Sequence, residues 1–232
     1  MTKRGALKAA FPHTLPILAG YLFLGIAAGI LMHDKGHPLW LTMLLSVVVY
    51  AGSLQILAAE IFAAAFHPLA AFGLALAVNA RHLFYGLSML RKFHGTGKKR
   101  LYLIFGLTDE TYSLLCSTEP PVGVDAGWFR FFITLLNQSY WIVGNLIGGL
   151  VGEGLPFPSE GIDFAMTALF TVILTEKMLD KASRLPALLG AGATAVCLLV
   201  FGAENFLPPA MALILALLAL FRHPLERGGE RA

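Results

Sequence analysis

The sequence predicts an all-α, polytopic helical membrane protein, and two observations carry this prediction. Of the 232 residues, 57% are hydrophobic and only 13% are charged, which lies outside the balance of a soluble domain. Apolar segments of roughly 20 residues, the length that a spanning helix needs, also recur along the whole chain. A secretory signal would instead give one short apolar stretch before a polar chain, so we expect no cleaved segment.

About seven to eight apolar segments are the candidate crossings. Glycines next to polar residues interrupt two of them, at Gly52 and Gly106, and prolines separate several others. We therefore expect one or more of the segments to be broken or re-entrant. The candidates span residues 13–32, 39–62, 68–90, 101–118, 128–152, 162–176, 185–202 and 207–222.

Basic residues gather in four clusters, at residues 3–8, 91–100, 177–184 and 222–231. Such clusters mark cytoplasmic loops, so the C-terminus is expected to be cytoplasmic. Three apolar segments separate the first cluster from the second, and three more separate the second from the third, although an even number of crossings is required each time. Either the first cluster is misleading or each trio contains one segment that enters and leaves on the same side.

The second alternative suggests internal repeats at about residues 10–90 and 101–176, with discontinuous helices near the bilayer midplane. The slight net positive charge, +3, falls in these short juxtamembrane runs rather than in one patch. The expected surroundings are therefore the lipid bilayer, and no nucleic-acid partner is expected.

The stretch NARHLFYGLS, residues 79–88, places a charge inside an apolar segment. An unpaired charge near the bilayer centre costs at least about 2.5–3.5 kcal/mol, so Arg81 needs a partner. Arg81 could bind a substrate carboxylate or take part in coupling, or it could only hold helices together. Helical spacing places the polar residues Asn79, Arg81, His82, Tyr85 and Ser88 away from the apolar half of the helix.

The stretch GLTDETYS, residues 106–113, supplies the natural partners of that arginine. Its polar side chains point all round a helix, so we expect the segment to be enclosed. Two adjacent carboxylates, Asp109 and Glu110, would resist ionising together in a low dielectric, and one of them could then exchange a proton near neutral pH. The alternative is that both only balance Arg81.

The stretch YAGSLQ, residues 50–55, is a third polar point. A continuous helix would turn the Gln55 amide away from the other polar side chains of this segment. A break at Gly52 and Ser53 would turn the amide inward and free backbone N–H groups for a carboxylate. The alternative is that Gln55 only hydrogen-bonds a neighbouring helix.

The stretch NQSYW, residues 137–141, begins a helical sector that continues into a small-residue pattern. The spacing Gly144-x-x-x-Gly148 predicts close helix packing. The amides of Asn137 and Gln138, with Trp141, could contact substrate or could join helices.

Four elements in chain order resemble the AzlC family over essentially the whole chain. They are YAGSLQ, NARHLFYGLS followed by a basic loop, GLTDETYS, and a W-x-x-G-N-x-x-G-G pattern that begins at Trp141. This family comprises the large subunits of branched-chain amino acid exporters, also called the LIV-E or azaleucine-resistance family. The resemblance implies a single transporter domain over residues 1–232 in the bacterial plasma (inner) membrane. It implies export of leucine, isoleucine and valine, often with methionine, by proton antiport, together with a small AzlD-type membrane subunit. Where the family favours a small residue and then Gln-Phe, this chain has Leu54, Gln55 and Ile56, and this departure leaves side-chain selectivity open.

The chemistry of these polar stretches defines the candidate site residues. The substrate-binding candidates are Gly52, Ser53, Gln55, Asn79, Arg81, Tyr85, Asn137, Gln138 and Trp141, and the proton-coupling candidates are His82, Asp109 and Glu110.

No enzymatic role, metal site or cofactor is expected, because the sequence has no Gly-x-Ser-Gly element, no helical His-Glu-x-x-His and no paired-aspartate protease pattern. Cys116 and Cys197 lie in apolar stretches without metal-ligand spacing. Two alternatives to a coupled exporter remain: a non-transporting membrane scaffold subunit and a passive amino-acid channel.

Overall fold

The computed structural model describes residues 3–63, 68–154, 171, 174–175, 178–179 and 184–221. Every regular element in these ranges is a helix, so the all-α prediction is confirmed for this part of the chain. The chain divides into two units, Met1–Ile162 and Asp163–Ala232. That the whole chain acts as a single domain with internal repeats stays a prediction.

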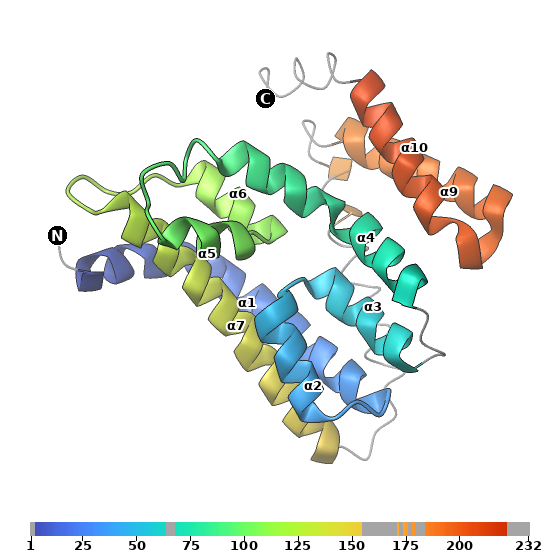
Figure 1. Ribbon diagram of the computed structural model, residues 1–232, viewed down its shortest axis with the longest axis horizontal. Helices are drawn as coiled ribbons and strands as arrows, with labels where there is room; N and C mark the ends of the chain where they lie inside the picture. The colour runs from blue at the N-terminus through green and yellow to red at the C-terminus, as the bar shows by residue number, and fades with distance from the viewer. Residues whose placement is uncertain are drawn as a thin grey trace. The chain divides into compact units, whose positions relative to one another are not determined.

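Two long helices form the frame of the first unit, α1 (Lys3–Asp34) and α7 (Ala126–Gly154), which lie side by side (Figure 1). Their backbones meet through glycines. A Cβ added to Gly25 would lie 3.0 Å from the Cα of Gly144, and one added to Gly148 would overlap the α1 backbone. The glycine pattern on α7 is therefore confirmed as a close-packing face.

The second apolar segment is broken, as its glycine indicated. It consists of α2 (Leu39–Leu44), a π-helical turn (Leu45–Val49) and α3 (Gly52–Ala63). Tyr50 ends the π-helical turn in the left-handed conformation, with φ 43° and ψ 47°. This conformation cannot continue a helix, so a new helix begins at Gly52.

The fourth candidate segment is also two helices, and it follows α4 (Pro68–Met89). These helices are α5 (Lys99–Phe105) and α6 (Asp109–Ser117). The Thr108 hydroxyl accepts a hydrogen bond from the backbone N–H of Thr111 and so caps α6. The prediction of broken helices is thus confirmed in two segments.

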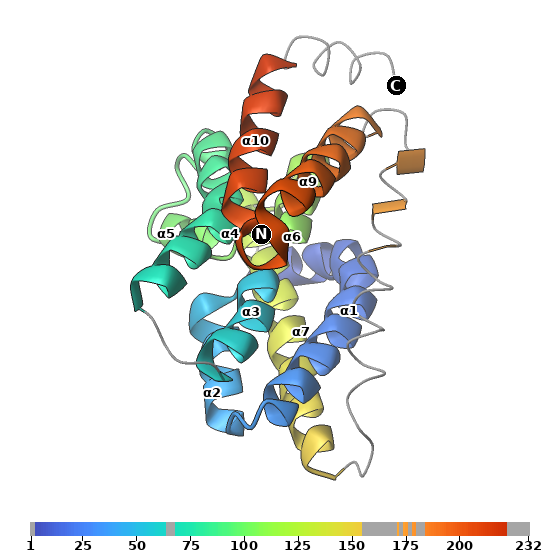
Figure 2. The same ribbon diagram turned by 90° about the vertical axis from the view of Figure 1, so that its right-hand side faces the viewer.

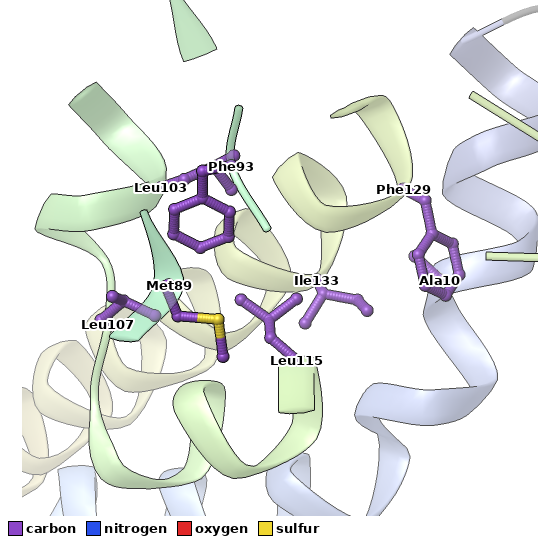
Figure 3. Packing of buried hydrophobic residues seen from close by; sticks show 8 residues of the cluster. All are labelled: Ala10, Met89, Phe93, Leu103, Leu107, Leu115, Phe129 and Ile133. Carbon is purple, nitrogen blue, oxygen red and sulfur yellow. The ribbon is translucent and has the colours of Figure 1, made fainter. Parts of the chain in front are cut away.

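A compact apolar cluster fixes the position of α6 against its neighbours (Figure 3). Leu115 of α6 and Ile133 of α7 are almost completely buried there. Because the cluster takes side chains from α1 and from the α4–α6 region as well, it sets where the first turn of α6 lies in this unit. Its members are Ala10, Met89, Phe93, Leu103, Leu107, Leu115, Phe129 and Ile133.

The second unit contains α9 (Arg184–Asn205) and α10 (Leu207–Leu220), which pack against each other (Figure 2). Gly202 interrupts α9 with a left-handed φ of 72°. The candidate segment 162–176 lies mostly outside the described residues, and the C-terminal basic cluster lies entirely outside them.

Two of the described helices are long and apolar enough to cross a bilayer by length and composition, Lys3–Asp34 and Arg184–Gly202. Leu39–Val49 and Gly52–Ala63 are shorter apolar helices. The predicted count of about seven to eight segments is therefore not confirmed. Breaks shorten some of the other candidates, and polar residues such as Arg81 dilute the apolar run of α4.

Candidate functional site

The guanidinium of Arg81 joins three helices of the first unit. Its Nη1 lies 3.0 Å from Oδ2 of Asp109, at the start of α6. Its Nη2 donates to the hydroxyl of Ser53 in the first turn of α3 at 2.9 Å. The predicted carboxylate partner of Arg81 is thus confirmed to be Asp109.

A tyrosine holds the second carboxylate oxygen of this pair. Tyr85 OH donates to Oδ1 of Asp109 at 2.6 Å, one helical turn after Arg81 on α4. The Tyr85 ring stacks on Tyr112 with centroids 4.4 Å apart. Asp109 is therefore oriented by two side chains of α4, as helical spacing of i and i+4 allows.

The ion pair is not sealed inside the protein core. The side chains of Arg81 and Asp109 are 42% and 41% exposed, and Glu110 is exposed as well. This differs from the expectation that the GLTDETYS stretch is enclosed. The reason is the helix break: because α6 begins at Asp109, its first turn projects from the core while Thr111 is buried.

Two helix N-termini converge on this arginine, because Arg81 reaches the first turns of both α3 and α6. The first N–H groups of each helix have no acceptor within the helix and carry partial positive charge. Asp109 is the single carboxylate that Arg81 contacts among the described residues. Arg81 and Asp109 therefore pair beside the first turns of α3 and α6.

The other carboxylate of the pair, Glu110, faces a different helix. Its Oε2 accepts a hydrogen bond from Tyr21 OH of α1 at 2.7 Å. Tyr21 OH also contacts the hydroxyl of Thr108, which donates to the Thr111 hydroxyl at 2.9 Å. Asn137 Nδ2 on α7 donates to the same Thr111 oxygen at 3.0 Å. A hydroxyl network thus runs from Glu110 into the interior.

Gln55 is fully buried and uses its amide within the protein. Its Nε2 donates to Asn145 Oδ1 at 2.6 Å and to Ser46 Oγ at 3.2 Å. Its Oε1 accepts from Trp141 Nε1 at 3.0 Å. The break before α3 turns Gln55 inward as predicted, and these contacts match the alternative in which it joins helices.

Gln138 likewise connects elements around the break. It accepts a hydrogen bond from Tyr102 OH of α5 at 2.6 Å. Its Nε2 donates to the carbonyl of Val47, in the π-helical turn, at 3.1 Å. Gln138 therefore satisfies a carbonyl that this turn leaves available.

The remaining candidates, Asn79, His82 and Gly52, lie close to these residues but form no side-chain hydrogen bond with them in the described part of the chain. His82 contacts Tyr85 edge to face, with ring centroids 5.8 Å apart. Among the described residues, Asn79 Oδ1 and His82 Nδ1 are buried with no hydrogen-bond partner. Gly52 packs under Trp141, because a Cβ added there would lie 3.1 Å from the indole ring.

The sequence reasoning missed Tyr21 and Tyr102. Both are single tyrosines in apolar helices, and a tyrosine in such a place is equally typical of packing or of a membrane interface. Their partners, Thr108 and Gln138, are far away in sequence. A buried tyrosine hydroxyl needs a hydrogen-bond partner, and this requirement is the signal that could have identified both residues as network members.

An ion-pair cluster near the ends of the apolar segments anchors the loop after α6. Lys92 Nζ lies 2.8 Å from Glu119, and Arg130 Nη2 lies 3.7 Å from the same carboxylate. The hydrogen bond and charge of Lys92 hold the pKa of Glu119 below its usual value. Arg130 also donates to the carbonyl of Lys92 at 2.7 Å, which ties α7 to the basic loop.

Comparison with known proteins relates the chain to one family. Residues 16–155 match the family model described as AzlC protein. The chain is 49% identical over 222 residues to the branched-chain amino acid transport protein AzlC of Bacillus subtilis (strain 168), covering 96% of this chain and 87% of that protein.

Further relatives are named as membrane proteins. An uncharacterized membrane protein of Haemophilus influenzae is 44% identical, over 89% of this chain and 85% of its own. The inner membrane protein YgaZ of Escherichia coli is 28% identical, over 73% and 72%. No solved structure matches the chain. This chain is therefore a membrane protein that belongs to the AzlC family.

Proposed function

We propose that this chain is a secondary transporter that exports branched-chain amino acids by proton antiport. The observation that carries the proposal is the Arg81 bridge between two helix N-termini and Asp109. Discontinuous helices whose N-termini surround an anion site are a recurring device of secondary transporters. The Bacillus subtilis relative, named a branched-chain amino acid transport protein, supports this substrate class.

The carboxylate of the amino acid would bind at Arg81 and Ser53. Asp109 accepts from Arg81 and Tyr85. An entering carboxylate would compete with Asp109 for the guanidinium and gain the freed N–H groups at the start of α3. Asn79, next to Arg81 on α4, would contact the same substrate.

Antiport requires that proton and substrate exclude each other. The ammonium group of the amino acid needs a negative acceptor, which Asp109 or Glu110 can provide only when deprotonated. A proton bound to that carboxylate removes the acceptor, so the two ligands alternate. His82, beside Tyr85, is the third candidate for carrying the proton.

The side chain of the substrate would need an apolar contact. Ile56, Phe84 and Trp141 are the candidates, and Phe84 is 55% exposed on α4. Gln55, Asn137 and Gln138 would support the site by holding the surrounding helices together.

The proposed setting is the bacterial inner membrane, where the chain would work with a small AzlD-type subunit. The chain would carry no enzymatic activity and no cofactor. A passive channel and a non-transporting scaffold are the two rival functions, and concentrative flux distinguishes both from a coupled carrier. The exposed ion pair favours transport, because a scaffold needs packing faces rather than an accessible charged site.

The test is leucine flux into proteoliposomes driven by an imposed proton gradient, comparing wild type with Asp109→Asn and Glu110→Gln. We expect at least one variant to lose the response to the gradient while remaining folded. Unchanged proton coupling in both variants would contradict the assignment of these carboxylates. Ser139→Ala is the control, because the Ser139 hydroxyl donates to the Leu135 carbonyl of its own helix and to no other described residue.

A further inference from the structure

The hydroxyl network next to Glu110 contains two oxygen atoms whose hydrogen-bonding capacity is unused. Asn137 Oδ1 and Tyr50 OH are buried and have no hydrogen bond to any described residue. Asn137 is 0% exposed and Tyr50 is 3% exposed. A buried polar atom without a partner costs about 1–3 kcal/mol, so a ligand that satisfies both would be stabilised.

Both atoms belong to the same cluster. The Asn137 amide reaches the cluster through its Nδ2, which donates to Thr111, and Oδ1 is bonded to the same carbon. The Tyr50 hydroxyl lies beside Thr111 and Tyr21. The cluster therefore presents oxygen atoms from α1, α6, α7 and the break before α3.

The cluster contains one carboxylate, Glu110, that no basic side chain of the described residues neutralises. Glu110 accepts a hydrogen bond from Tyr21, but it forms no ion pair with any basic side chain in the described part of the chain. Its neighbour Asp109, in contrast, is paired with Arg81. Glu110 is exposed on one side, and on the other it adjoins the cluster of hydroxyl and amide oxygens through Tyr21. A carboxylate next to hydroxyl and amide oxygens is a donor set that suits a hard cation or an ammonium group.

We infer that Glu110, Asn137 and Tyr50, with the Thr108 and Thr111 hydroxyls, form a binding site for a monovalent cation. Two sources share this chemistry: the ammonium group of the transported amino acid and a free sodium ion. The ammonium source rests on the proposed function, whereas the sodium source does not.

The position of the cluster suits the ammonium of a bound amino acid. Asp109 and Glu110 are consecutive in the first turn of α6, so their Cα atoms are about 3.8 Å apart. Asp109 faces Arg81, where the carboxylate of the substrate would bind, and Glu110 faces Tyr21. An α-amino acid carries its two charged groups on one carbon, so the ammonium source requires one molecule to contact both Arg81 and Glu110.

The experiment measures the thermal midpoint of the purified full chain in detergent at constant ionic strength. One arm compares sodium chloride with choline chloride, and a second compares 3-methylbutylamine with 4-methylpentanoate, which carry only the amine and only the carboxylate. The matched variants are Glu110→Gln, Asp109→Asn and Tyr50→Phe. Tyr50→Phe removes one hydroxyl and keeps the buried ring, so it should change the midpoint without ligand much less than it changes the response to the cation.

We expect sodium or the amine to raise the midpoint of wild type and of Asp109→Asn. The apparent affinity should fall at least about tenfold in Glu110→Gln, which corresponds to about 1.4 kcal/mol, and several-fold in Tyr50→Phe. A sodium response assigns the site to a free ion, and an amine response assigns it to the ammonium group.

Absence of both responses in folded wild type overturns the inference, and so does an equal response in Glu110→Gln. Leucine flux in proteoliposomes is measured in parallel. Flux without any cation response overturns this site alone, whereas a sodium response without flux overturns the proposed function alone.

Discussion

At the scale of single residues, one side chain links the three helices of the candidate site. Arg81 contacts Ser53 on α3 and Asp109 on α6 through different nitrogens of its guanidinium. A planar guanidinium can make these two contacts at once, and an ammonium group on a flexible chain cannot reproduce that geometry. The identity of the residue, and not only its charge, therefore decides the arrangement.

The first prediction concerns that geometry. Arg81→Lys should keep the attraction to Asp109 but lose the bridge to Ser53, so leucine flux should fall several-fold. Arg81→Gln should lower flux at least about tenfold more, because it leaves Asp109 without a cation. Initial rates in proteoliposomes at equal protein loading measure both. Equal flux in Lys and Gln variants would show that the charge at this position has no role.

A second prediction concerns Gln55. Gln55→Leu would leave Trp141 Nε1 and Asn145 Oδ1 buried without these partners, so the free energy of unfolding should fall by about 2–4 kcal/mol. Ser139→Ala should change it by less than about 0.5 kcal/mol. Chemical denaturation in mild detergent measures the difference. If Gln55→Leu is as stable as the control, the amide does not hold these helices together.

At the scale of helices, glycine decides how closely α1 and α7 approach. A Cβ on Gly29 would overlap the backbone carbonyl of Asn145, whereas a Cβ on Gly20 of the same helix would meet nothing within 4 Å. One helix thus carries a glycine that the packing requires and a glycine that it does not.

The third prediction uses this pair. Gly29→Ala should lower the free energy of unfolding by about 1–3 kcal/mol, because the two helices must separate to admit the methyl group. Gly20→Ala should be neutral or stabilise by up to about 1 kcal/mol, since alanine favours helix. Thermal midpoints of the two variants, measured side by side, check the contrast, and an equal loss in both would contradict the packing described.

The fourth prediction concerns the loop after α6. The pKa of Glu119 is lowered in the folded state by Lys92, so the ion pair stabilises the fold above the ordinary pKa of 4.5 and this contribution is lost as pH falls. The difference in thermal midpoint between wild type and Glu119→Gln should therefore vanish at acidic pH. Because the carboxylate is exposed, salt should also reduce the difference at neutral pH. A difference that persists at low pH would exclude the ion pair as its cause.

At the scale of the whole molecule, the sequence predicts what depends on local composition. The helical class, the break next to Gly52 and the need of Arg81 for a carboxylate all follow from runs of residues and the cost of a buried charge. The choice of Asp109 over Glu110 as that carboxylate does not follow, because it depends on which helices flank the first turn of α6.

Three further features depend on tertiary contacts and were not predictable. The π-helical turn Leu45–Val49 leaves a carbonyl that Gln138, on another helix, satisfies. Tyr21 reaches its partner Thr108 only after α1 packs in the fold. The exposure of the first turn of α6 depends on how the apolar cluster around Leu115 positions this helix against its neighbours.

The central claim is coupled export of a branched-chain amino acid by this chain. The most direct measurement is labelled-leucine counterflow in proteoliposomes, with this chain alone and with its small AzlD-type partner, each with and without an imposed proton gradient. The account predicts leucine flux that responds to the gradient, in one or both of these preparations. Folded protein that shows no leucine flux under any of the four conditions would contradict it.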